Sequence, residues 1–176
     1  MAIVSGETLA DTNRLTIINH FRALENGDLE GALTAFAPDM VNHRMEPGSP
    51  PGRAGLAATL GVVLRCFPAA AWRLESIVAD SEVVASMIVI EGTAHGVIMG
   101  VRAAGQRVAW RHTHWFRMSG GKVVEHDAIR DDRGLLRQLG MNVRGPHPGG
   151  LGGGLGSSEK GATGSGEQES VPLTVG

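Results

Sequence analysis

Apolar residues recur at helical spacing in the first part of the chain. Between Thr8 and Glu25 they fall three and four positions apart and end at Asn26-Gly27, a common C-terminal stop for a helix. The apolar positions are Ile17, Ile18, Phe21 and Leu24. Asp28 can then cap a second, shorter helix that carries Ala32, Leu33 and Phe36. The pattern therefore predicts two consecutive helices, over residues 8–25 and from residue 29 onwards.

The next segments alternate between irregular and regular patterns. Residues 38–45, "PDMVNHRM", indicate a short extended piece, and residues 46–55, "EPGSPPGRAG", indicate a loop because proline and glycine disfavour a regular element. Residues 56–67, "LAATLGVVLRCF", have the apolar content of a third helix that ends before Pro68. We expect this helix to pack on the same core as the first two.

After Pro68 the spacing changes from helical to strand-like. Apolar runs separated by turn residues predict strands over residues 72–79, 82–92, 95–101, 107–118 and 122–129. Residues 131–140, "DDRGLLRQLG", indicate a final short helix capped by Asp131 or Asp132. Helices followed by a mostly antiparallel meander predict the α+β class, with helices packed on one face of a curved sheet.

Composition sets the domain organisation. The chain has 176 residues with 42% hydrophobic content, enough for one globular domain, which we place at residues 1–144. Residues 145–176 are rich in Gly and Ser and nearly free of large apolar residues, so we expect a flexible tail.

Charge and cysteine content narrow the classes of partner. A net charge of −2, without basic runs, argues against binding to nucleic acid or to an anionic membrane. Neither a signal peptide nor a membrane-spanning run is recognisable. The single Cys66 cannot form an intramolecular disulfide, which fits a cytoplasmic protein.

Three histidines lie on a predicted hairpin, "RHTHWFRMSGGKVVEHDAIRDD". Alternation along a strand puts His112 and His114 on one face with Trp110 and Phe116. A three-residue loop at Ser119–Gly121 would pair His114 with His126 and His112 with Ala128. A two-residue loop would instead pair His114 with Glu125 and His112 with Asp127. We favour the three-residue loop, because two adjacent glycines suit it.

In the favoured register, three imidazoles share an apolar wall, as in many small-molecule pockets. Histidine transfers protons near neutral pH, and burial would lower its pKa and keep it neutral. We therefore expect acid/base chemistry, with a pH–rate limb near neutrality. A metal held by the three histidines is a weaker alternative. Asn42 and His43 enter the sheet where the helical layer ends and are further candidates to line the cavity.

The residues from about Thr12 to Gly140 resemble the SnoaL-like polyketide cyclases of the nuclear-transport-factor-like superfamily. The resemblance lies in "PDMVN", in the pattern "GxR...HxxR...GKVxEH" around the hairpin, and in "GLLRQLG". It implies a cone-shaped α+β barrel, a homodimer, and a pocket that closes a ring in an apolar ketone or ester without metal or organic cofactor. Such an enzyme would belong to secondary metabolism, for example antibiotic biosynthesis.

Carried over by motif, the resemblance implies catalytic roles for Asn42, His114 and His126. The family's catalytic aspartate falls on Ala128, and a family glutamine falls on His112. Three alternatives stay open at this point. His112 could supply the base, Asp127 could turn inward through a bulge, or the protein could catalyse a different reaction or only bind its ligand. The homodimer would form through the outer sheet face, whose residues are Arg111, Thr113, Trp115 and Arg117.

Overall fold

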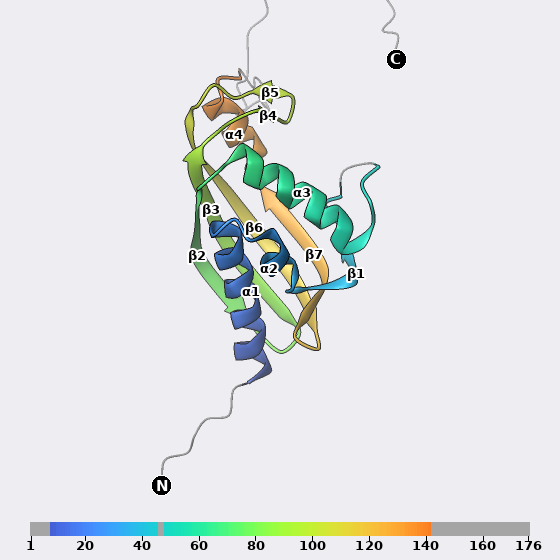
Figure 1. Cartoon of the computed structure of the whole chain (residues 1–176). Coiled ribbons are helices and arrows are strands. Elements are labelled where there is room, and N and C mark those ends of the chain that lie inside the picture. The colour runs from blue at the N-terminus through green and yellow to red at the C-terminus, as the bar shows by residue number, and fades with distance from the viewer. Residues whose placement is uncertain (1–7, 46–47, 142–176) are drawn as a thin grey trace, which may run out of the picture. The chain divides into compact units, whose positions relative to one another are not determined.

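The computed structural model describes residues 8–45 and 48–141 (Figure 1). The predicted tail, residues 145–176, lies outside the described residues. Within the described part, three helices pack on one face of a five-stranded sheet, and a fourth short helix follows the last strand. This arrangement confirms the predicted α+β class.

The first helix ends and the second begins where the sequence indicates, but Phe36, which was expected in the second helix, instead begins the first strand. Helix α1 spans Leu9–Glu25 and is preceded by Thr8, which forms a reciprocal capping box with Asp11. Gly27 follows with a φ of 72°, a left-handed conformation that glycine adopts without strain. Helix α2 spans Leu29–Leu33, and the Asp28 carboxylate accepts a hydrogen bond from the Gly31 N–H at 2.8 Å.

Helix α3 spans Gly52–Cys66, so its predicted start at residue 56 was wrong by four residues. Pro51 immediately precedes the first turn, where a missing N–H costs nothing. The loop therefore ends at Pro51, and Arg53 and Ala54 in the first turn have high helix propensities.

The main sheet has the strand order β1-β7-β6-β3-β2. Its strands are β1 Phe36–Asn42, β2 Ala71–Ala79, β3 Val83–Thr93, β6 Arg107–Ser119 and β7 Lys122–Arg130. All neighbours are antiparallel except β1 and β7, which run parallel. The parallel pair brings the end of β1, and with it Asn42, beside His126 in the middle of β7.

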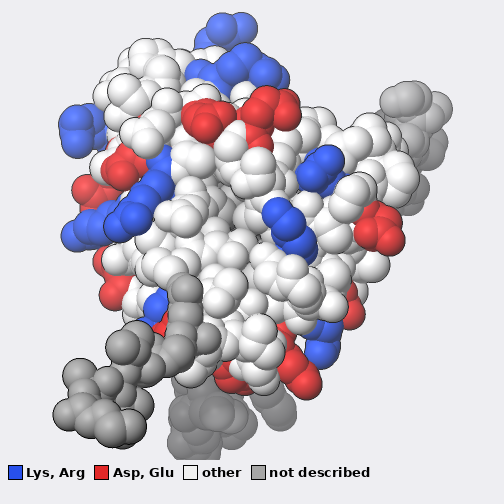
Figure 2. Space-filling view, turned by 60° about the horizontal axis from the view of Figure 1, so that its bottom comes forward, with Lys and Arg blue, Asp and Glu red and all other residues white. Residues whose placement is uncertain are grey.

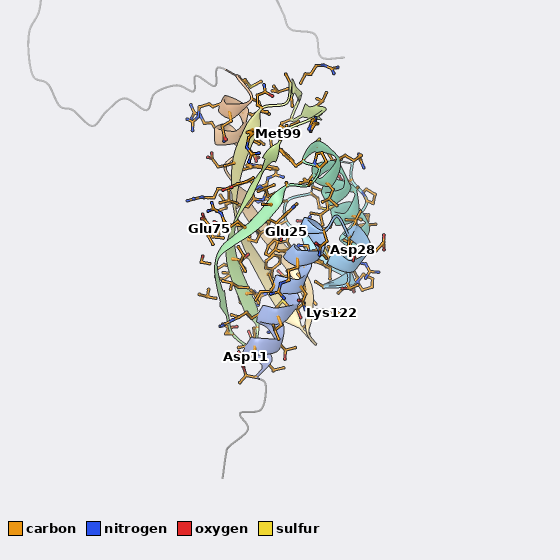
Figure 3. All side chains as sticks on the ribbon, turned by 60° about the vertical axis from the view of Figure 1, so that its left-hand side comes forward. Asp11, Glu25, Asp28, Glu75, Met99 and Lys122 are labelled. Carbon is orange, nitrogen blue, oxygen red and sulfur yellow. The ribbon has the colours of Figure 1, made fainter. Side chains whose placement is uncertain are left out.

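The predicted strand over residues 95–101 was wrong. The structure instead has two short strands, β4 Val97–Ile98 and β5 Val101–Arg102, which form a separate two-stranded sheet. Met99 and Gly100 connect them with φ values of 47° and 80°, so the chain reverses in the middle of the apolar run. Figure 3 shows Met99 at this hairpin. Helix α4, Asp132–Gln138, is capped by Asp131 as predicted.

The hairpin between β6 and β7 has neither of the two predicted registers. Gly120 and Gly121 form a two-residue turn with φ values of 55° and 71°. The pairing then shifts by one residue, because Met118 pairs with Val123 whereas Arg117 pairs with Glu125. Val124 is the extra, bulged residue. As a result His114 lies opposite Ala128 instead of His126, and His112 lies opposite Arg130 instead of Ala128.

The core fills the space between the sheet and the helices. Even-numbered residues of β3 and β6 point inward, among them Val84, Ile88 and Ile90, and pack against Ile17 and Phe21 of α1. Figure 3 shows Glu75 on the opposite side of the sheet, away from the helices. None of the helices in the described ranges is both long and apolar enough to cross a bilayer.

Candidate active site

The concave face of β6 and β7 carries the histidines. The bulge at Val124 restores the alternation, so His126, Ala128 and Arg130 face the helices together with His112 and His114 of β6. A two-residue turn without the bulge would point the odd-numbered residues of β7 inward instead. The prediction that His112, His114 and His126 share one face therefore agrees with the structure, although the register differs.

Asn42, His126 and His114 form a continuous hydrogen-bonded series. Asn42 Oδ1 lies 3.3 Å from His126 Nδ1. His126 Nε2 lies 3.0 Å from His114 Nδ1. The fifth and last polar atom of the series, His114 Nε2, is buried and has no hydrogen-bond partner among the described residues. The series therefore begins at the end of β1 and ends at one ring nitrogen of β6.

The direction of these hydrogen bonds is set by the Arg44 backbone. The Arg44 N–H donates to Asn42 Oδ1 at 3.1 Å, which identifies this atom of the amide as the oxygen. An amide oxygen only accepts, so His126 carries its proton on Nδ1 and its Nε2 is an acceptor. His114 must then donate from Nδ1. Its Nε2 is left as an unprotonated, unpaired base.

The low polarity of the site keeps these imidazoles neutral. Burial lowers the pKa of His126 to about 4, and the His20 ring adds to this effect. Burial also lowers the pKa of His112, to about 3, with further contributions from Arg130 and His126. The pKa of His114 is held well below 6.5, first by burial and then by the neighbouring histidines. These lowered pKa values move the expected pH–rate limb of the free protein from neutrality to lower pH.

Two neighbouring cavities share part of their lining, and histidines line one of them. The inner cavity, of about 60 Å³, is lined by the histidine series and by Trp110, Phe116 and Ala128. The outer cavity, of about 490 Å³, lies between α3 and the β4–β5 hairpin and is mostly apolar. Four residues line both cavities: Thr59, Val63, Trp110 and Arg130. The outer cavity has the size of a small-molecule site, whereas the inner one holds only a small polar group.

Three polar atoms around the inner cavity have no partner among the residues that the structure describes. These atoms are Trp110 Nε1, His112 Nε2 and His114 Nε2. Trp110 Nε1 can only donate a hydrogen bond, whereas His114 Nε2 accepts. Buried polar groups are normally paired, so these three atoms are candidates to bind the polar atoms of a ligand.

Two contributors to the site were not predicted from the sequence. His20 of α1 lines the inner cavity, and its Nδ1–H donates to the Ala32 carbonyl at 3.0 Å. Its spacing from Ile17, Phe21 and Leu24 places it on the buried helix face, which was the available signal. Arg130 was missed because the predicted last strand ended at residue 129.

Two predicted site residues lie away from the cavities. His43 is exposed, and its Nε2 lies 3.4 Å from Glu125 Oε2. Asp127 does not turn inward, because the bulge comes at Val124 and leaves the alternation intact around residue 127. Its Oδ1 accepts a hydrogen bond from Arg44 Nε at 2.7 Å.

The histidine face does not have the geometry of a metal site. Across residues 8–45 and 48–141, no three His, Cys, Asp or Glu side chains converge as a ligand set. His114 Nδ1 donates a hydrogen bond to His126 Nε2, so the lone pair of His126 Nε2 is already used. A metal ion would need a free lone pair on each nitrogen that binds it.

Comparison with known proteins identifies the family. The SnoaL-like polyketide cyclase family model matches residues 16–139, and the chain belongs to this family. The chain is 30% identical to AclR, a candidate hydroxylase from Streptomyces galilaeus, over 73% of this chain and 95% of AclR, with a TM-score of 0.64. It is also 30% identical to IdmH, a candidate polyketide cyclase from Streptomyces antibioticus, over 73% of this chain and 99% of IdmH, with a TM-score of 0.63.

TsrD from Streptomyces laurentii has the same fold, with a TM-score of 0.68, at 21% identity over 73% of this chain and 95% of TsrD. Among curated proteins, none matches the chain.

Proposed function

We propose that the protein closes a ring in an apolar ketone or ester by acid/base catalysis at His114. The observation that carries this proposal is the fixed series from Asn42 to His114, which leaves His114 Nε2 as a buried, unpaired base. Family membership supports a cyclase-type reaction, and the apolar outer cavity supports a substrate with a large apolar part.

In the proposed reaction, His114 Nε2 takes a proton from the carbon beside a substrate carbonyl. The indole N–H of Trp110 donates a hydrogen bond to the carbonyl oxygen as it gains negative charge. The carbon then forms a bond to a second carbonyl of the same molecule. The protonated His114 returns its proton to the new alkoxide, so the product is an isomer of the substrate. Asn42 and His126 act as positioning residues.

The chemistry of a low-pKa base limits the substrate. A neutral imidazole with a lowered pKa removes a proton only from an acidic carbon. A carbon between two carbonyl groups meets this requirement. We therefore propose a 1,3-dicarbonyl compound of a natural-product pathway as the substrate, and no cofactor for its cyclisation.

A direct test follows turnover of a panel of anthraquinone-type β-keto esters by wild-type protein, His114→Gln and a control, His95→Gln. His95 is exposed and lies outside both cavities. We expect wild-type and control activity to agree and the His114 variant to lose at least about 100-fold, the usual contribution of a general base. Equal activity in all three proteins would refute the role of His114.

Hydroxylation is the second candidate function. It is favoured by the 30% identity to AclR and by the apolar Ala128 at the position where the family resemblance places a catalytic aspartate. The mass of the product distinguishes the two reactions, because cyclisation by addition leaves the mass unchanged and hydroxylation adds one oxygen atom. Tight binding of the panel by wild type and by His114→Gln, without turnover, would indicate a binding protein instead.

We also propose a homodimer that forms through the outer face of the sheet. Trp115 is 55% exposed on this face, and Ile129 is 71% exposed beside it. Arg111 and Arg117 flank Trp115 and form ion pairs with Glu75 and Glu125. Covering this apolar group with a second copy would remove it from water.

Binding to nucleic acid or a membrane is not part of the proposal. Figure 2 shows basic and acidic residues interspersed around a broad uncharged area on the face in view. This distribution supports the prediction that the partner is a small molecule. A cytoplasmic location remains a prediction, supported by the free, buried Cys66 thiol.

A further inference from the structure

Arg130 occupies the junction between the two cavities. It is the last residue of β7, and its side chain lines both the inner and the outer cavity. The guanidinium carbon lies 5.6 Å from the centre of the Trp110 ring, and Nη2 lies 3.2 Å from Asp132 Oδ2. These two contacts hold a side chain that is only 26% exposed. Arg130 is therefore held in place beside both cavities.

The charged residues that line the cavities are arginines, and the carboxylates that pair with them lie outside the lining. Among the described lining residues of either cavity there is no aspartate or glutamate. Arg44 lines the inner cavity, but its Nε is engaged with Asp127 on the outside. Asp132 uses one nitrogen of Arg130 and does not line either cavity. A guanidinium has five N–H donors, so several remain for a ligand.

The effect of Arg130 reaches the histidines. Its charge contributes, after burial, to the lowered pKa of His112, and makes smaller contributions at His114 and His126. Protein groups thus supply a positive charge to the cavity, and no described lining carboxylate compensates for it there. Such a site favours an anion, which arginine binds through paired hydrogen bonds.

We propose that Arg130 binds a carboxylate of the ligand at the junction of the two cavities, so that the substrate is an apolar keto acid. The ring system lies in the outer cavity of about 490 Å³, and the reacting carbonyl enters the inner cavity of about 60 Å³. This proposal rests on the proposed function for the identity of the reacting group, but the recognition of a carboxylate is independent of turnover. The bound anion also favours protonation of His114, and so makes it a stronger base.

The test compares two probes of nearly the same shape, the anion anthraquinone-2-carboxylate and the neutral anthraquinone-2-carboxamide, in which one oxygen acceptor is replaced by an NH2 donor. Their affinities are measured by isothermal titration calorimetry at pH 7.5 for wild-type protein, Arg130→Gln, Arg130→Lys and Arg73→Gln. Arg73 is the control, because it lies on the outer face and pairs with Glu91 at 2.7 Å. A charge-assisted hydrogen bond predicts that the wild type prefers the carboxylate by about 10- to 100-fold.

Arg130→Gln should abolish the preference while it changes the affinity for the carboxamide little. Arg130→Lys should retain part of the preference, and Arg73→Gln all of it. The proposal is overturned if the wild type binds both probes equally, a comparison that needs no variant to fold. It is also overturned if a folded Arg130→Gln keeps the preference.

Failure of this proposal and failure of the proposed function are separable. Charge-selective binding without turnover of any β-keto acid or ester would support Arg130 and refute the cyclase. Turnover of neutral esters that Arg130→Gln leaves unchanged would support the cyclase and refute the carboxylate.

Discussion

Replacement of His112 by glutamine should make the protein less sensitive to acid. His112 is buried, and its folded-state pKa is about 3 compared with an ordinary value of 6.5. Because the folded value is the lower one, stability is fully present above pH 6.5 and is lost as the pH falls toward 3. Glutamine cannot titrate and has a similar size, so it removes this loss.

The size of the effect follows from linkage. At pH 5 the unfolded chain has bound almost a full proton at this residue, whereas the folded protein has bound almost none. The free energy of unfolding is therefore lower at pH 5 than at pH 7 by about 2 kcal/mol from this residue. His20 and His126, each with a folded-state pKa of about 4, contribute in the same direction. Together these losses are a large part of the total stability of a small domain, so we expect the wild type to keep only part of its free energy of unfolding at pH 5.

The assay is urea unfolding followed by circular dichroism at pH 7.0, 6.0, 5.5 and 5.0. Between the extremes, His112→Gln should lose about 2 kcal/mol less free energy of unfolding than the wild type. His95→Gln is the control, since its side chain is exposed. Parallel pH dependences in the wild type and His112→Gln would show that burial does not suppress protonation of this ring.

Four further outcomes are expected. Asn42→Leu removes the acceptor that fixes the His126 tautomer and should lower kcat by about tenfold. Asn42→Asp keeps an acceptor and should retain most of the wild-type kcat. Equal kcat values for the two variants would contradict this positioning role. Ala128→Asp places a carboxylate opposite His114 and should raise the pKa of His114 by about 1 to 3 units. The pH–rate profile should then show a new limb. An unchanged profile would mean that the new carboxylate does not interact with His114. In the wild type, kcat/KM should stay constant from pH 9 to about 6, because the pKa values of His112 and His126 in the ligand-free protein lie below this range. A limb near pH 6.5 would mean that a histidine of the site has its ordinary pKa. Light scattering at tens of micromolar should give a dimer for the wild type and a monomer for Trp115→Arg; a monomeric wild type would contradict the proposed interface.

The order of the elements was largely predictable because local patterns determine it. The capping residues Thr8, Asp28 and Asp131 bound three of the four helices where the sequence indicates. The β4–β5 reversal was not predicted, because the apolar run "VIMGV" continues through a turn whose first residue is methionine. A left-handed methionine is held by surrounding structure that a local pattern does not contain.

The site was predictable in composition but not in detail. That His114 and His126 share a face followed from strand alternation, whereas the contact between their rings depends on a bulge that the sequence does not mark. The direction of the hydrogen bonds depends on one backbone N–H, that of Arg44, which lies in the turn after β1 and is far away in the sequence from the histidines. Long-range pairing of β1 with β7 brings these groups together, and local spacing carries no information about it.

The bulge at Val124 has a consequence for how such genes diverge. Loss of the Val124 codon would remove the bulge but leave Met118 opposite Val123 and Arg117 opposite Glu125, so His126 and Ala128 would still face the cavity. The bulge therefore lets the length of this hairpin vary by one residue without moving the histidines. Straightening the bulge without losing a residue would have the opposite effect, because Glu125 and Asp127 would then turn inward.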